Sequence, residues 1–201
     1  MKNLKLFYKK QFNLFGATPK GVAWTDSNKS KNRYKTLLKI IQLERKKNFS
    51  ILDVGCGYGE LIKYLPKNKN FEYTGIDVVE EMIAYAKKTY KDKRLKFKLA
   101  DILTISNNYD YIVCNGIFTL KNDLNNKKMR DFVFKCIKNF YKFSRVGFSF
   151  NVMSDVVDYK SSLLFYPKLY SIIKTLNNKK LSKIYIDNTS TEYETSFFFI
   201  K

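Results

Sequence analysis

The chain has 201 residues, of which 45% are hydrophobic and 16% aromatic. This composition supplies a sizeable core and excludes a largely disordered chain. The formal net charge of +20 permits a nucleic-acid or anionic-membrane partner. However, arginine, which is best suited to bidentate phosphate binding, provides only five of the 38 basic side chains. The scattered lysines are more typical of a generally solvated basic surface, so we expect no nucleic-acid partner.

Histidine is absent from the sequence, which removes the commonest metal ligand and the commonest general base. We therefore expect no metal site. Cys56, Cys114 and Cys136 lack C-x-x-C spacing and lie in apolar segments, which is typical of buried thiols in a reducing, cytoplasmic compartment. The sequence contains no run of 18 apolar residues, so we expect no membrane span. The lysine-rich N-terminus does not have the pattern of a signal peptide.

The segment before residue 49 is expected to be helical. Residues 1–15 place aromatic and aliphatic side chains among lysines, which predicts a helix that either packs on the domain or lies on a membrane surface. Glycine and proline in 16–24 predict a loop. Apolar residues then recur at helical spacing over 28–47, and either Asp26 or Ser27 is placed to cap that helix.

Strand and helix patterns alternate from residue 49 onward. Short apolar runs predict strands at 49–54, 73–77, 95–99, 109–114, 147–151, 184–186 and 197–200. Helical spacing predicts a helix after Gly59, ended by Pro66 and the polar run 67–70, and others near 79–90, 129–141 and 166–177. This alternation favours an α/β fold with a doubly wound, mostly parallel sheet. The short polar loop between the last two strands indicates an antiparallel hairpin.

The most informative stretch runs from Ile51 to Leu61 and reads Ile-Leu-Asp-Val-Gly-Cys-Gly-Tyr-Gly-Glu-Leu. It predicts a strand, a tight turn in which glycines let the backbone approach a ligand, and a helix. The stretch resembles motif I of class I S-adenosylmethionine-dependent methyltransferases. That resemblance implies a Rossmann-like seven-stranded sheet and S-adenosylmethionine as the cofactor. It also implies a single methyltransferase domain over 1–201. In that domain, 1–48 forms a helical lid, 49–151 the cofactor-binding core and 152–201 the acceptor side.

The same resemblance assigns cofactor roles to residues that follow the predicted strands. Asp77, twenty residues beyond Gly57, is expected at the ribose hydroxyls, although a helix cap alone would also explain it. Asp101 and Ile102 are expected at the adenine, although Asp101 also suits an ordinary loop position. Asn115 and Gly116 are expected at the methionine moiety.

Other residues complete the expected cofactor site. Asp53 is expected to organise the glycine loop, and Cys56 to have a structural role there. Trp24 and Arg33 are candidates for cofactor contact from the lid, but they also fit a core anchor and a surface residue. The full set of expected cofactor-binding residues is Trp24, Arg33, Asp53, Gly55, Cys56, Gly57, Gly59, Asp77, Val78, Asp101, Ile102, Asn115 and Gly116.

The methyl acceptor is specified less sharply by the sequence. The Pro-Pro-Tyr pattern of base-amino methyltransferases is absent after the fourth strand. Residues 147–154, 157–160 and 164–167 resemble a bacterial subgroup of small methyltransferases that serve surface-polysaccharide or small-metabolite synthesis, including phosphoramidate methylation. A small-molecule acceptor is therefore expected. An anionic acceptor would need no base, whereas a neutral hydroxyl would need one, and Tyr159, Tyr166 and Asp187 are the candidates. An RNA or protein methyltransferase and an inactive cofactor-binding module remain alternatives.

Overall fold

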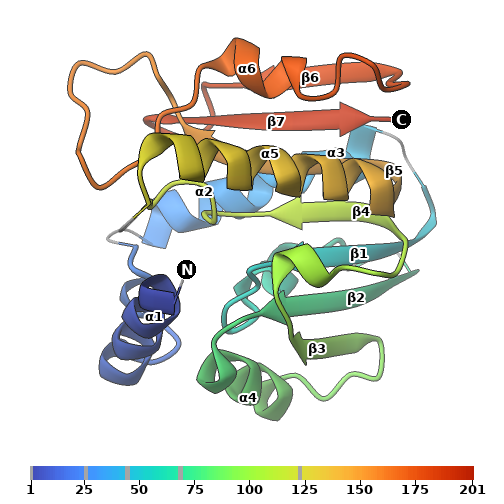
Figure 1. Cartoon of the computed structure of the whole chain (residues 1–201). Coiled ribbons are helices and arrows are strands. Elements are labelled where there is room, and N and C mark those ends of the chain that lie inside the picture. The colour runs from blue at the N-terminus through green and yellow to red at the C-terminus, as the bar shows by residue number, and fades with distance from the viewer. Residues whose placement is uncertain (1, 25–26, 44–45, 68–69, 122–123) are drawn as a thin grey trace.

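A computed structural model of the chain describes residues 2–24, 27–43, 46–67, 70–121 and 124–201 (Figure 1). Asp26, one of the two residues expected to cap a helix, lies outside these ranges. All seven predicted strands form one sheet in the order β3-β2-β1-β4-β5-β7-β6. Their bounds are β1 Asn48–Val54, β2 Asn70–Asp77, β3 Leu95–Leu99, β4 Tyr109–Cys114, β5 Ser144–Met153, β6 Lys183–Asp187 and β7 Glu194–Ile200.

The direction of the strands confirms the predicted α/β fold. The first five strands pair in parallel, and β7 lies antiparallel between β5 and β6. The chain winds outward from β1 through β2 to β3, then returns to place β4 on the other side of β1. The carboxyl ends of β1 and β4 therefore form the topological switch point, where ligands of doubly wound sheets bind.

Helices cover both faces of the sheet (Figure 1). They are α1 Lys2–Phe15, α2 Ser27–Leu37, α3 Lys39–Leu43, α4 Glu80–Thr89, α5 Asn126–Phe143 and α6 Leu169–Lys174. Short 3-10 helices span Pro19–Val22, Glu60–Tyr64 and Ile102–Thr104. The helix expected over 28–47 is therefore two helices that meet at Leu38. None of the helices described is long and apolar enough to cross a membrane.

The helix expected after Gly59 ends before Pro66, as predicted, but it forms as the five-residue 3-10 helix Glu60–Tyr64. Gly59 enters it with a φ of 88° and gives it no side-chain cap. Leu65 leaves it with a ψ of 145°, and Pro66 follows. A residue before proline is disfavoured in the helical region, so the chain must extend at Leu65.

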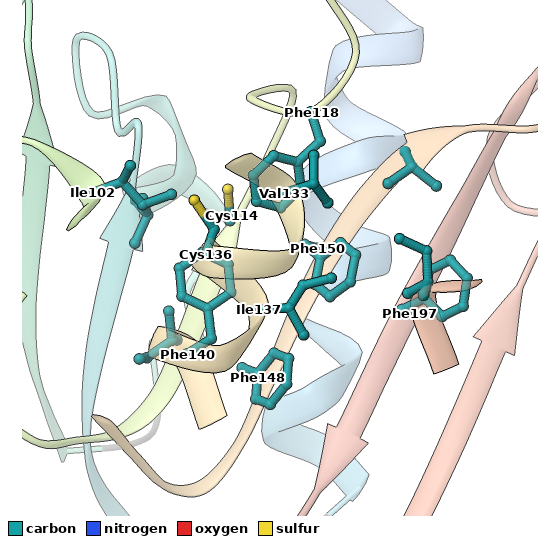
Figure 2. Close-up of a cluster of buried hydrophobic side chains, with 14 of the residues drawn as sticks. Ile102, Cys114, Phe118, Val133, Cys136, Ile137, Phe140, Phe148, Phe150 and Phe197 are labelled. Carbon is teal, nitrogen blue, oxygen red and sulfur yellow. The ribbon is translucent and has the colours of Figure 1, made fainter. Parts of the chain in front are cut away.

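The core follows from the two-residue periodicity of the strands. Phe197 and Phe199 of β7 face the α5 side of the sheet, whereas Phe198 and Ile200 face α2 and α3. Figure 2 shows the α5 side, where the phenylalanines of β5 and β7 pack beside Cys136, Ile137 and Phe140 of α5. The rings of Phe148 and Phe199 stack at a centroid distance of 4.9 Å. This packing fixes the strand register and, with it, the positions of the strand ends.

The amphipathic N-terminal helix packs on the domain. Phe12 of α1 is buried and stacks on Tyr58 at a centroid distance of 6.3 Å. Lys9 forms an ion pair with Glu81 of α4. Figure 1 shows α1 on the side of the sheet toward which β4 points, so this helix lies beside the carboxyl ends of the parallel strands.

Candidate functional site

A cavity of about 330 Å³ lies at the carboxyl ends of β1, β2 and β4. Its wall combines the glycine loop, the residues that follow each of these strands, part of α1 and the loop before α2. The residues expected at the cofactor that line it are Trp24, Asp53, Gly55, Cys56, Gly57, Asp77, Val78, Asp101, Ile102, Asn115 and Gly116. Eleven positions spread over nearly a hundred residues of sequence therefore meet in one cavity.

The glycine loop turns directly beneath this cavity. Gly57 has a φ of 54°, a left-handed conformation that favours glycine. A Cβ at this position would lie only 3.3 Å from a methyl group of Val22. Cys56 is a buried thiol whose Sγ lies 3.6 Å from the carbonyl oxygen of Gly57, in keeping with the expected structural role. The loop can thus present backbone, without side chains, to a ligand.

Asp77 joins the glycine loop to the turn after β2. Its Oδ2 accepts a hydrogen bond from the Gly57 backbone N–H, and its Oδ1 accepts one from Val79, both at 2.9 Å. Burial raises the pKa of this carboxyl, and the backbone hydrogen bonds oppose the increase. Each carboxylate oxygen has a second lone pair, so Asp77 can hold the loop and still accept hydrogen bonds from a ligand hydroxyl.

Asp53 is a buried carboxyl at the end of β1. Its Oδ2 accepts a hydrogen bond from the Tyr73 hydroxyl at 2.7 Å. Burial raises the pKa of Asp53 to about 7; the Tyr73 hydrogen bond opposes this change and the Asp77 charge adds to it. A cationic group bound nearby would favour the ionised form. The cavity therefore contains one acidic group that responds to a positive ligand near neutral pH.

The ends of β3 and β4 add polar groups of different kinds. Asp101 caps a short 3-10 helix, because its Oδ1 accepts from the Leu103 N–H at 2.8 Å. The Asn115 side chain is 7% exposed, and neither its amide nitrogen nor its amide oxygen has a protein partner. An unpaired buried amide is costly, so this one is suited to a ligand that supplies both partners. Gly116 follows it with a φ of 76°.

Comparison with known proteins assigns the chain to a family. A family model described as "Methyltransferase domain" matches residues 45–188. The chain belongs to this family. The matched range contains β1 to β6 and every cavity residue that follows a strand.

Individual relatives agree with the family assignment. The chain is 36% identical to malonyl-[acyl-carrier protein] O-methyltransferase of Acetivibrio thermocellus over 92 residues, 44% of this chain and 32% of that protein. It is 27% identical to cyclopropane-fatty-acyl-phospholipid synthase of Escherichia coli K12 over 97 residues, 47% of this chain and 25% of that protein. The chain thus spans less than two thirds of the length of these curated relatives.

Solved structures share the fold over almost the whole chain. The N-methyltransferase NodS of Bradyrhizobium japonicum WM9, in complex with S-adenosylhomocysteine, superposes with a TM-score of 0.70 and 18% identity, covering 99% of this chain and 98% of that one. Magnesium protoporphyrin IX methyltransferase of Synechocystis PCC 6803, with bound S-adenosylmethionine, superposes with a TM-score of 0.67 and 14% identity. The superposition covers 98% of this chain and 96% of that one. The match to a methyltransferase domain over 45–188 and this shared fold agree with the predicted cofactor, S-adenosylmethionine.

The cavity residues suit this cofactor chemically. S-adenosylmethionine carries ribose hydroxyls, an exocyclic amine, an ammonium, a carboxylate and an apolar adenine face. Asp77 and Asp101 supply acceptors, the Asn115 amide supplies an unpaired donor and acceptor, and Ile102 supplies an apolar wall. Asp53 is the buried acid that a cationic ligand would ionise.

Two expected cofactor residues lie outside the cavity lining. Gly59 packs beneath Tyr90 and Phe97, on the far side of the glycine loop. Arg33 forms an ion pair with Glu194 and lies against the ring of Trp24, its guanidinium carbon 5.0 Å from the ring centroid. Arg33 therefore does not line the cavity itself.

The three candidate bases also lie away from the cavity. Tyr159 is 80% exposed on the long loop after β5. The Tyr166 hydroxyl accepts a hydrogen bond from the Ser161 N–H at 3.1 Å. Burial by itself would raise the pKa of Asp187, but hydrogen bonds from Lys39, Ser190 and Thr189 outweigh burial and hold that pKa well below its usual range. In this arrangement none of the three is placed to take a proton from a group bound in the cavity.

Several lining residues were not anticipated from the sequence. Tyr8 of α1 lines the cavity, and burial together with the charge of Asp77 raises its pKa to about 12, so its hydroxyl stays protonated as a donor. The other unanticipated lining residues include Leu4, Lys5, Leu120, Lys121, Leu124 and Phe132. The amphipathic pattern of 1–15 signals a buried helix face, but not which surface that face meets. Among the residues described, no group of three or more Cys, Asp or Glu side chains is arranged to hold a metal ion.

Proposed function

We propose that this protein transfers a methyl group from S-adenosylmethionine to a small-molecule acceptor. The observation that carries the proposal is the character of the cavity wall beyond the cofactor residues. That wall is largely apolar and aromatic, with Tyr8, Leu120, Leu124 and Phe132 among its members. Of the described residues that line the cavity, Lys5 and Lys121 are the only cationic ones. A nucleic acid would need several phosphate contacts at the entrance, so this wall favours a small acceptor.

Bound S-adenosylmethionine supplies an activated methyl group on its sulfonium. The protein has to bind the two reactants, orient them and exclude water from the cavity. Asp77 and Asp101 are positioned to hold the adenosine hydroxyls and amine, while α1 and residues 22–24 form part of the cavity wall. Holding the two reactants in line can account for roughly 7–11 kcal/mol of such a barrier.

The positions of the candidate bases favour an acceptor that is anionic before it binds. Tyr159, Tyr166 and Asp187 are not part of the cavity wall. A neutral hydroxyl would need a base there, whereas a carboxylate or phosphoramidate needs no proton removed. Lys5 and Lys121 would attract such an anion. We therefore propose O-methylation of an anionic acceptor, and the resemblance of 147–167 suggests a precursor of a surface polysaccharide, handled in the cytoplasm.

Product analysis with defined acceptors tests this proposal. Purified protein is incubated with S-adenosylmethionine and a panel of carboxylates, phosphoramidates, neutral nucleotide sugars and RNA, and methylated products are identified by mass. We expect methylated product from an anionic small molecule, with KM for that acceptor raised about tenfold in Lys121→Gln and unchanged in Lys168→Gln, an exposed lysine outside the cavity. Methylation of RNA, or of neutral sugars only, would contradict the proposal.

A further inference from the structure

An ion pair between a buried carboxylate and a partly buried guanidinium joins segments that are far apart in the sequence. Arg33 of α2 contacts Glu194 at the start of β7, with Nη2 2.5 Å from Oε1. The Glu194 side chain is 3% exposed and the Arg33 side chain 19%. The other carboxylate oxygen of Glu194 accepts a hydrogen bond from Asn151 Nδ2 of β5 at 2.6 Å. Both oxygens of a buried carboxylate are thus occupied by specific partners.

The network continues to the backbone at the end of β4. Asn151 Oδ1 accepts a hydrogen bond from the Gly116 N–H at 2.8 Å. Gly116 lines the cavity, and it follows Asn115, whose amide is buried without a protein partner. The Arg33–Glu194 pair is therefore connected, through one side chain, to the backbone that forms this wall of the cavity.

Arg33 reaches the same wall a second time through Trp24. Its guanidinium carbon lies 5.0 Å from the centroid of the Trp24 ring. The edge of that ring covers Gly116, because a Cβ built on Gly116 would lie 3.3 Å from Trp24 Cζ2. The contacts therefore close into a ring of five residues, which we call the Arg33 ring: Arg33, Glu194, Asn151, Gly116 and Trp24.

Stability alone gives a weak reason for such an arrangement. Removing two charges from water is costly, and apolar residues of similar volume often give equal or greater stability. What a buried pair provides is a defined geometry, since its partners cannot shift without leaving a charge unpaired. In the Arg33 ring, the charged pair and Asn151 can impose this defined geometry on Trp24 and Gly116. Both of these residues line the cavity.

We propose that Arg33, Glu194 and Asn151 are positioning residues that hold Trp24 against Gly116 and so preform one wall of the cofactor cavity. This inference rests on the proposed function, because it assigns the wall to the cofactor site of the methyltransferase. A preformed wall removes the cost of ordering the Trp24 side chain when the ligand binds. It also keeps the reacting groups aligned, and small misplacements at a reacting centre can lower rates by about a hundredfold.

The sequence supplies a direct probe of this arrangement, since Trp24 is its single tryptophan. Tryptophan fluorescence therefore reports the Arg33 ring without labelling. The variants are Glu194→Gln, Arg33→Gln and the double variant, in which no charge is left unpaired if a single variant folds poorly. Lys39→Gln is the matched control: it breaks the Lys39–Asp187 pair, which joins α3 to β6 in a similar way but touches neither Trp24 nor Gly116.

Acrylamide quenching of Trp24 and calorimetric titration with S-adenosylhomocysteine are measured for each protein. We expect the quenching constant to rise about twofold or more in both single variants, and no further in the double variant, because the two residues act through one network. S-adenosylhomocysteine should bind about three- to tenfold more weakly to the ring variants, since the wall must then be ordered on binding. Lys39→Gln should match the wild type in both measurements.

Three results would overturn the inference. Unchanged quenching in the ring variants would show that the ring does not hold Trp24, and an equal rise in Lys39→Gln would indicate general loosening. Raised quenching with undiminished ligand affinity would show that this wall is not part of the cofactor site. The proposed function fails in a distinguishable way, by absence of S-adenosylhomocysteine binding to the wild type.

Discussion

Some side chains that line the cavity also make structural hydrogen bonds. Asp77 binds the backbone of Gly57 and Val79 and still faces the cavity. Asp77 is not a helix cap, because Val79 is the N-cap of α4. The two backbone hydrogen bonds of Asp77 instead join the glycine loop to the turn after β2. Asp101 caps a short helix and lines the cavity. The carboxyl ends of parallel strands meet at one edge, which is why residues after strands could be placed together from the sequence.

Asp53 makes the stability of the ligand-free protein depend on pH. Its pKa is about 7 in the folded protein, against 3.8 for an ordinary aspartate, because burial disfavours the charged form. The folded state therefore holds the proton more tightly, and stability falls as pH rises from about 4 to 7, by at most about 4 kcal/mol. Asp53→Asn removes this titration while keeping an acceptor for Tyr73.

Thermal unfolding of both proteins between pH 4 and 8 measures the effect. The melting temperature of Asp53→Asn, relative to wild type, is expected to increase from pH 4 to pH 7 and then level off. Other groups titrate in both proteins and cancel in this difference. A difference that is constant across the range would contradict the buried, weakly acidic Asp53.

Elements differ in how far their sequence determines them. The strands were predictable because β-branched and aromatic residues alternate between two buried faces, as Phe197 to Ile200 do in β7. The end of the helix after Gly59 was predictable from Pro66, whereas its 3-10 geometry was not. The pattern of α1 predicted a helix, but its contact with α4 depends on Phe12 meeting Tyr85, which no local pattern specifies.

Phe12 is expected to decide whether α1 stays docked beside the cavity. Its ring stacks on Tyr58 and meets the edge of Tyr85 at 5.9 Å. Replacing a buried phenylalanine with alanine costs about 3–5 kcal/mol, which exceeds what a peripheral helix can tolerate locally. In Phe12→Ala we expect protease cleavage within residues 2–15 to accelerate about tenfold or more, with little change in the melting of the sheet.

Phe15→Ala provides the comparison for this experiment. Phe15 lies on the same helix but is 44% exposed, and its loss should leave the cleavage rate near that of wild type. S-adenosylhomocysteine should slow cleavage of the wild type, because Leu4, Lys5 and Tyr8 line the cavity. Equal cleavage of Phe12→Ala and Phe15→Ala would contradict the docking of α1 through Phe12.

The positive charge of the whole molecule is not concentrated at the cofactor cavity. The net charge of +20 comes from lysines spread over the sequence, yet the described part of the cavity wall contains only two of them. The sequence could predict the sheet and the cofactor cavity, since both depend on strand order and strand ends. It could not predict the Arg33 ring, because Arg33, Asn151 and Glu194 come from elements whose contacts arise only in the folded sheet.

The central claim is that the cavity at the ends of β1, β2 and β4 binds S-adenosylmethionine through Asp77. Calorimetric titration of S-adenosylhomocysteine tests it most directly, with wild type, Asp77→Ala and Asp92→Ala, an exposed carboxylate paired with Arg94, as the three proteins. Binding to wild type and Asp92→Ala is expected to be equal, and Asp77→Ala should lose about 1.5–3 kcal/mol, roughly 10- to 150-fold in affinity, because charge-assisted hydrogen bonds are removed. Melting curves establish that each variant is folded. Undiminished affinity in a folded Asp77→Ala, or no binding to the wild type, would contradict the account.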